Sequence, residues 1–244
     1  MAAALEETKQ NARAIATLRR GVSVAPQDAL LWYQLAGAYS NGGDAERALE
    51  ALRKAVDADP EFADAYDLMG SISAGVMDDA RAEDAFRTSL RIWPDSAAAL
   101  GNLAHVLAAL GKLPEAEYRF ARSIKLKPDD AEVRTNYSVT LAGLNRFPEA
   151  RRQIEAALRL DPKFPDAHNF HGALLAHDGD NDAALAEFLE AVRLKPDYAL
   201  AHLNAAKTFL NKGERVRARE QLELAAKGED AGVRAEAMAL LGSL

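Results

Sequence analysis

Large apolar residues and alanines follow a helical spacing along much of this chain. In residues 29–62, Leu31, Leu35 and Tyr39 fall four residues apart, and the segment Asn-Gly-Gly at 41–43 then interrupts the pattern. The helical spacing resumes at Ala48, Leu49, Leu52 and Val56. Because glycine and asparagine favour turns, this stretch is predicted to form two helices joined by a short turn.

The same pattern returns every 34 residues. Prolines mark the period at Pro26, Pro60, Pro94, Pro128, Pro162 and Pro196. Alanines precede them at Ala14, Ala48, Ala82, Ala116, Ala150 and Ala184, and Ala218 continues this column. Large apolar residues recur at Leu18, Leu52, Phe86, Phe120, Ile154, Phe188 and Leu222. Small residues recur at Ala36, Gly70, Ala104, Ser138, Gly172 and Ala206. Such self-similarity predicts a stack of repeated helix pairs.

A further column indicates how the first helix of each pair ends. It contains Gly43, Gly111, Gly179 and Gly213, with Asn145 in another unit. Glycine and asparagine tolerate the left-handed backbone conformation that terminates many helices. Met77 fills the same place in the second unit, where no local feature explains it. Pro114 and Pro148 stand where second helices should start, a position that tolerates proline.

These residues resemble a known family, the tetratricopeptide repeat. The resemblance rests on Trp32, Leu35, Ala36 and Tyr39, followed by Ala48, Leu52 and Pro60. It covers units at 29–62, 63–96, 97–130, 131–164, 165–198 and 199–232. The resemblance implies an all-α fold, an α-solenoid in which antiparallel helix pairs stack into a right-handed superhelix.

The resemblance also divides the chain. Residues 1–28 are expected to form a partial N-terminal repeat helix, residues 29–232 six units of 34 residues, and residues 233–244 a C-terminal capping helix. In the sixth unit, Asp230 stands where the other units have proline.

Composition and charge exclude several classes of function. The formal net charge is −7, with a pI near 5.3, which disfavours electrostatic binding of nucleic acid or anionic lipid. The absence of cysteine excludes disulfides and thiolate metal sites. The N-terminal residues lack the features of a signal peptide, and no apolar run is long enough to span a membrane. We therefore expect a cytoplasmic location and no direct membrane insertion.

Candidate chemistry is sparse. His168 and His171 are spaced as neighbours on a helix, and Asp178, Asp180 and Asp182 alternate after them. However, the twelfth residue from Asp178 is a leucine, where a calcium loop needs glutamate. The two histidines also occupy columns filled by Trp32 and Leu35 in the first unit, so we interpret them as packing residues. Nothing resembles a catalytic triad or a phosphate-binding loop. The sequence predicts no enzyme, no cofactor and no metal.

The resemblance directs attention to the inner wall, which first helices line in this family. Amides would stand there at Gln34, Asn102, Asn136 and Asn204, beside Tyr33, Asp67, Phe170 and Lys207. A side-chain amide can donate to and accept from a peptide backbone. Acidic residues at Asp64, Asp67, Glu132 and Asp166 favour a neutral or basic peptide. The alternative interpretation is that these amides are solvated helix residues.

The sequence therefore favours a non-catalytic scaffold that binds an extended protein segment in a concave groove. The basic clamp that some family members use to hold acidic peptide termini is absent, because Tyr33, Gly37, Asp67, Ser71 and Gly101 occupy its places. Two other functions stay open. The chain could be a regulatory or targeting domain of a larger enzyme or membrane-assembly factor. It could also self-associate through the face at residues 5–26 or through the tail at Leu240, Leu241 and Leu244.

Overall fold

The computed structural model describes the backbone of residues 2–244 and the side chains from residue 10 onward. These residues form fourteen α-helices and no strand. The side chains at positions 5–9, which belong to the predicted N-terminal self-association face, lie outside the described residues. The chain divides into two compact units, Met1–Lys127 and Pro128–Leu244, each much larger than one 34-residue repeat. They are called the first unit and the second unit from here on.

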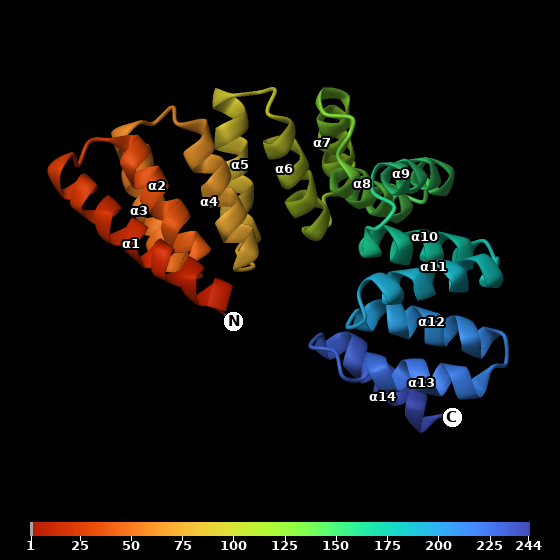
Figure 1. Cartoon of the computed structure of the whole chain (residues 1–244). Coiled ribbons are helices and arrows are strands. Elements are labelled where there is room, and N and C mark those ends of the chain that lie inside the picture. Colours follow the sequence, from red (N-terminus) through yellow and green to blue (C-terminus); the bar gives the residue numbers. More distant parts are fainter. Residues whose placement is uncertain (1) are drawn as a thin grey trace. The chain divides into compact units, whose positions relative to one another are not determined.

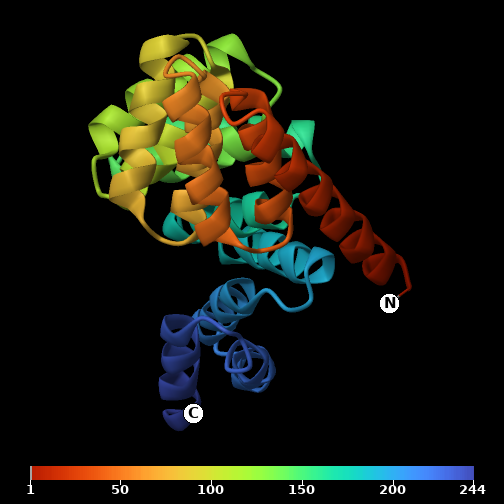
Figure 2. The same ribbon diagram turned by 90° about the vertical axis from the view of Figure 1, so that its left-hand side faces the viewer.

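The first unit contains seven helices. They are α1 (Ala2–Val24), α2 (Ala29–Asn41), α3 (Ala45–Ala58), α4 (Ala63–Gly75), α5 (Asp79–Ile92), α6 (Ala97–Ala109) and α7 (Leu113–Leu126). Neighbouring helices run antiparallel, and α2 with α3, α4 with α5 and α6 with α7 form the tightest pairs (Figure 1). The helix α1 is 23 residues long and extends well past its neighbours (Figure 2).

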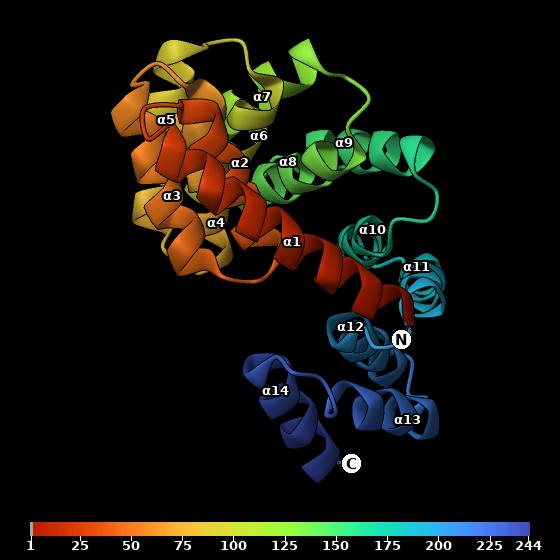
Figure 3. The ribbon, with the colours of Figure 1, turned by 60° about the vertical axis from the view of Figure 1, so that its left-hand side comes forward.

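The second unit repeats the arrangement. Its helices are α8 (Ala131–Gly143), α9 (Phe147–Leu160), α10 (Pro165–His177), α11 (Asn181–Leu194), α12 (Ala199–Asn211), α13 (Arg215–Ala225) and α14 (Ala231–Gly242). The last helix packs against α13 and α12 (Figure 3). Both units thus confirm the predicted all-α solenoid of helix pairs.

Short polar side chains cap many of the helix starts. The side chain of the capping residue accepts from the backbone N–H three residues later at Asp28, Asp44, Asp78, Ser96, Asp130, Asp180 and Asp230. Pro114 and Pro148 lie in the first turns of α7 and α9, where a missing N–H removes no intrahelical bond.

The turns between paired helices share one left-handed residue. Its φ is positive at Gly43, Gly111, Gly179 and Gly213, and equally at Asn145 and Met77. Met77 adopts φ +58° with 89% of its surface exposed, so no packing of its side chain offsets the backbone strain. The repeat therefore imposes the turn geometry even where the local residue disfavours it.

The core of each pair is built from matched columns of small and large side chains. The alanines from Ala48 to Ala218 at the 34-residue period are fully buried. Where Phe86 and Phe188 fill the core, the facing residue is Gly70 or Gly172, and an added Cβ would lie 2.7 Å from the ring in both cases. A methyl group is thus already too large at these two points.

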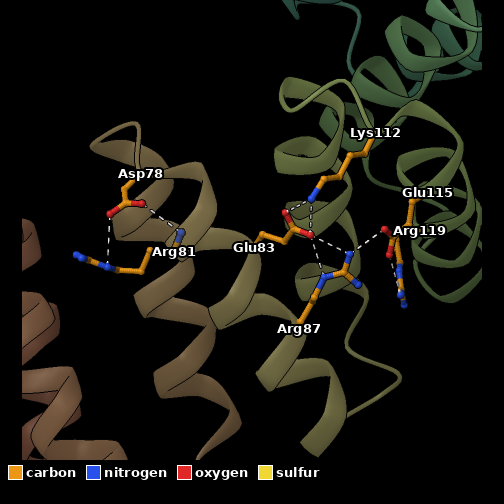
Figure 4. A network of polar contacts seen from close by, with 7 residues as sticks. All are labelled: Asp78, Arg81, Glu83, Arg87, Lys112, Glu115 and Arg119. Atoms are coloured by element: carbon orange, nitrogen blue, oxygen red, sulfur yellow. Dashed lines mark hydrogen bonds and ion pairs between the residues drawn. The ribbon is translucent and has the colours of Figure 1, made fainter.

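An ionic network ties the second and third helix pairs of the first unit together (Figure 4). Lys112, just before α7, reaches both carboxylate oxygens of Glu83 on α5, at 2.9 and 2.6 Å. Arg87 donates to Glu83 and, at 2.8 Å, to Glu115 on α7. These bonds hold the pKa of Glu83 and that of Glu115 below the ordinary glutamate value, against the opposing effect of burial.

The C-terminal end departs from the predicted register. The helix α13 has 11 residues where the second helices of earlier pairs have 14. The α14 helix therefore begins at Ala231, two residues before the expected boundary at 233. Gly228, two residues before the cap Asp230, takes the place that proline occupies in the other units, so the assignment of that place to Asp230 was wrong. The Cβ of Ala199 lies only 2.3 Å from where a Gly228 Cβ would stand, which excludes any side chain there.

Among the described residues, no helix combines the length and the apolar character that crossing a membrane requires.

Candidate functional site

The first helices of successive pairs lie side by side within each unit. In the first unit, α4 contacts both α2 and α6, and in the second unit α10 contacts both α8 and α12. We call the surface along α2, α4 and α6, and separately that along α8, α10 and α12, the first-helix face of its unit. Each predicted groove residue belongs to one of these two faces.

The amide column differs between its members. Gln34 and Asn102, in the first unit, are exposed, and Asn136 is half-buried. The side chains of these three residues make no hydrogen bond within the described part of the chain. Asn204 instead donates to Asn169 Oδ1 at 2.9 Å, and Asn169 is 6% exposed. Asn204 therefore acts partly as a bridge between α12 and α10, a role that the sequence analysis did not anticipate.

Tyr33 and two aspartates form an acidic cluster on the first unit's face. The Tyr33 ring packs against Phe62, with centroids 5.1 Å apart. Burial raises the pKa of the Tyr33 hydroxyl, and Asp64 and Asp67 raise it further. The negative charges of both aspartates thus act on the same aromatic side chain.

Asp67 is a partly desolvated carboxylate in this cluster. Burial raises its pKa, the Ser89 hydroxyl opposes the rise, and Asp64 adds to it. Nevertheless, Asp67 Oδ1 and Ser89 Oγ are both buried without a hydrogen-bond partner of normal geometry. Because this oxygen has almost no accessible surface, it acts on a ligand at the face through its negative charge and not through a direct hydrogen bond.

The predicted groove residues of the second unit are more fully engaged. Lys207, expected to be the basic residue of the inner wall, lies 2.7 Å from Glu236 Oε1 on α14. The Tyr198 hydroxyl donates to Asp166 at 2.7 Å, and burial with this contact raises the pKa of Tyr198. Phe170 is half-buried. The positive charge of Lys207 is therefore balanced by a residue that the repeat pattern did not point to.

The histidine cluster is occupied by protein contacts. His168 places Nδ1 2.6 Å from Glu187 Oε2 and Nε2 3.0 Å from the Pro162 carbonyl oxygen. His171 Nδ1 lies 3.1 Å from the other oxygen of Glu187, without hydrogen-bond geometry. Burial opposes ionisation of Glu187, yet His171 and His168 hold its pKa below the ordinary value. The described residues contain no group of three or more His, Asp or Glu placed to hold a metal.

The Trp32 column has a structural role that the sequence analysis missed. A planar side-chain N–H at this place hydrogen-bonds the carbonyl oxygen six residues earlier, with donor–acceptor distances of 2.8 to 3.0 Å. The pairs are Trp32 with Pro26, Arg134 with Pro128, His168 with Pro162, His202 with Pro196 and Arg234 with Gly228. Tryptophan, arginine and histidine share this N–H, a signal that was present in the sequence. These residues are thus loop anchors as well as packing residues.

Sequence comparison supports the repeat assignment directly. One model described as a tetratricopeptide repeat matches residues 80–131, 139–199 and 178–234, and a second with the same description matches residues 4–72. The chain belongs to the tetratricopeptide repeat family. No curated protein matches this tetratricopeptide repeat chain.

Solved structures agree with the family. YrrB, described as a tetratricopeptide repeat protein with an unusual peptide-binding site, is 27% identical, with a TM-score of 0.63 over 75% of this chain and 95% of its own. PilW, a type IV pilus biogenesis factor, is 22% identical, with a TM-score of 0.76 over 86% of this chain and 98% of its own. A chain of the APC/C hetero-tetramer Cut9–Hcn1 is 19% identical, with a TM-score of 0.82 over 99% of this chain and 47% of its own. The second and third of these structures show similarity of fold. As a member of the tetratricopeptide repeat family, this chain is a protein-interaction scaffold.

Proposed function

We propose that this chain is a non-catalytic scaffold that binds an extended, neutral-to-basic peptide segment on its first-helix faces. The observation that carries the proposal is the cluster of Tyr33, Asp64 and Asp67, in which an aromatic ring lies beside two carboxylates. The ring supplies apolar contact area, and the carboxylates favour a lysine or arginine of the ligand.

The negative charges of Asp64 and Asp67 make a cationic ligand favourable. Asp64 is exposed and can accept a hydrogen bond from a lysine or arginine of the ligand, whereas the buried Oδ1 of Asp67 adds its negative charge nearby. Hydrogen bonds to charged groups contribute about 1.5–3 kcal/mol. In the second unit, Glu236 neutralises Lys207, so the carboxylates of Glu132 and Asp166 set the sign of charge on that face.

The exposed amides suit the backbone of the same ligand. Gln34 and Asn102 have side-chain donors and acceptors that no described residue uses, and an extended peptide presents both kinds of group. The similarity to YrrB, a protein described as having a peptide-binding site, supports the same class of ligand.

A selection of random linear peptides on the immobilised chain tests the proposal. We expect the selected peptides to be enriched in lysine and arginine and depleted of aspartate and glutamate. For a selected peptide, Asp64→Asn/Asp67→Asn should weaken binding by about tenfold, because a charge-assisted contact and a second nearby negative charge are lost.

A matched variant keeps the test specific. Asp57 on α3 and Glu155 on α9 are exposed residues of second helices. Asp57→Asn/Glu155→Gln changes the net charge equally and should leave the affinity nearly unchanged. Selection of acidic peptides, or an equal loss of affinity in both double variants, would contradict the proposal.

A further inference from the structure

A cavity separate from the first-helix faces opens between α1, α2 and α3 of the first unit. Its volume is about 430 Å³, which is within the range of small-ligand sites. Trp32 and Tyr39 of α2 line it together with Arg19 of α1 and Arg47 and Lys54 of α3. Trp32 and Tyr39 belong to a different stripe of α2 from Tyr33 and Gln34, so the cavity and the acidic cluster are distinct.

The cavity exists because a small residue stands opposite a large one. Ala51 lines it 19 residues after Trp32. In the repeats that begin at residues 131, 165 and 199 the residue at this distance is long and reaches its partner, whereas the second repeat has another alanine, Ala85. These contacts are Gln153 with Arg134 at 2.7 Å, Glu187 with His168 at 2.6 Å and Gln221 with His202 at 2.7 Å. The alanine methyl leaves empty the space that these side chains fill.

The lining carries positive charge in an acidic chain. Arg19, Arg47 and Lys54 outnumber Glu50, the acidic residue of the lining, whereas the whole chain has a net charge of −7. Arg47 is paired with Asp44 at 3.3 Å and stands over the Tyr39 ring. Arg19 and Lys54 form no ion pair within the described part of the chain. Two cations are therefore free to meet an anion beside an aromatic wall.

We propose that this cavity binds an apolar carboxylate. The hydrocarbon or aromatic body of the ligand contacts Trp32 and Tyr39, and its carboxylate is held by Arg19 and Lys54. The combination of aromatic walls with unpaired cations favours this chemistry over a neutral apolar molecule, which would leave the cations unused, and over a bare inorganic anion, which would leave the rings without contact.

Trp32 supplies the readout for a binding experiment. The chain has two tryptophans, and Trp93 is exposed and outside the cavity. In a Trp93→Phe background, titration with phenylbutyrate, or with N-acetylglycylphenylalanine as a peptide terminus, should change the Trp32 emission saturably. The corresponding amides, which lack the carboxylate, should bind at least about tenfold more weakly. Binding of both acids indicates a general site, and binding of the peptide acid alone identifies a chain terminus as the source.

Two variants separate recognition from folding. Arg19→Ala/Lys54→Ala removes exposed charges and should weaken acid binding by about tenfold. Arg91→Ala/Lys125→Ala, an equal charge change at exposed residues of α5 and α7, should leave it unchanged. The absence of a saturable response to either acid, equal binding of acids and amides, or equal affinity in the two double variants would overturn the proposal.

Discussion

Met77 is the residue most clearly at odds with its backbone. It occupies the left-handed turn position held by glycine in four other repeats, at φ +58°. A left-handed backbone lowers the stability of a non-glycine residue by about 1–2 kcal/mol. Glycine avoids this strain, but it also makes the unfolded chain more flexible, which cancels part of the gain. Met77→Gly should therefore stabilise the protein by about 0.5–1 kcal/mol, measured by urea denaturation.

Asn145 provides the matched comparison. It has nearly the same φ of +60°, but asparagine tolerates this conformation better than methionine. Asn145→Gly should therefore give a smaller gain. A lower urea midpoint for Met77→Gly would mean that a contact of the methionine side chain stabilises the protein more than the left-handed backbone destabilises it.

Gly70 is limited by the ring of Phe86. A Cβ at Gly70 would lie 2.7 Å from Phe86 Cε1, closer than packed carbon atoms can approach. Gly70→Ala should destabilise the protein by about 1–3 kcal/mol through overpacking. The first pair shows a compatible alternative, with Ala36 and Leu52 in the same columns.

This alternative supplies a test by rescue. Phe86→Leu alone should destabilise through loss of buried volume. The double variant Gly70→Ala/Phe86→Leu should be more stable than the sum of the two single changes implies. A purely additive double-mutant cycle would show that the two side chains do not limit each other.

At the scale of helices and turns, the Trp32 column connects α2, α8, α10, α12 and α14 to the loops before them. His202 is 2% exposed, and its Nε2 hydrogen-bonds the Pro196 carbonyl oxygen at 3.0 Å. His202→Phe keeps an aromatic ring but leaves that carbonyl and Gln221 without their partner. We expect a loss of about 1–3 kcal/mol in the free energy of unfolding.

The first repeat, residues 29–62, suggests how to restore the hydrogen bond between the helix and the loop before it. There the same two places hold Trp32 and Ala51, and the indole N–H donates to Pro26. His202→Trp/Gln221→Ala should therefore recover stability relative to His202→Phe. If neither the unmodified protein nor His202→Trp/Gln221→Ala is more stable than His202→Phe, the hydrogen bond contributes little to stability.

The ionic network between α5 and α7 predicts that the stability of the protein depends on pH. Contacts with Lys112 and Arg87 lower the pKa of Glu83, so its contribution to stability is present above the ordinary glutamate range and is lost as pH falls through the lowered value. Glu83→Gln should destabilise the protein at neutral pH, and the difference should shrink as the pH falls below the ordinary glutamate pKa and through the lowered value. Chemical denaturation of both proteins at neutral and at acid pH measures this. An unchanged difference at acid pH would exclude ionisation of Glu83 as the cause.

Helix positions were predictable because each depends on residues close in sequence. The capping aspartates, the prolines in first turns and the left-handed turn column all act within a few residues, and the 34-residue period reinforces them. Predictions were less accurate at the ends. The shortened helix α13 moved the register by two residues, since it lies where the repeat pattern fades and Gly228 replaces proline.

At the scale of the whole molecule, the site was harder to predict than the fold. A period assigns a residue to a face, but it does not say which side chains pair across helices. Lys207 was expected to offer its charge to a ligand, and it meets Glu236 on a helix outside the predicted repeats. Asn204 likewise meets Asn169, 35 residues away. Such contacts depend on rotamers and on packing between pairs.

The division of the chain gives the last prediction. Each unit contains three complete helix pairs, enough for an independently stable repeat stack. Fragments 1–127 and 128–244 should therefore both be helical and unfold cooperatively, as measured by circular dichroism during heating. The acidic cluster of Tyr33, Asp64 and Asp67 belongs wholly to the first fragment. A lysine-containing peptide selected on the intact chain should bind that fragment, and Asp64→Asn/Asp67→Asn should weaken this binding as it does in the whole protein. If the first fragment folds but only the second binds the peptide, the carboxylates of Glu132 and Asp166 carry recognition, and the assignment to the first unit is wrong.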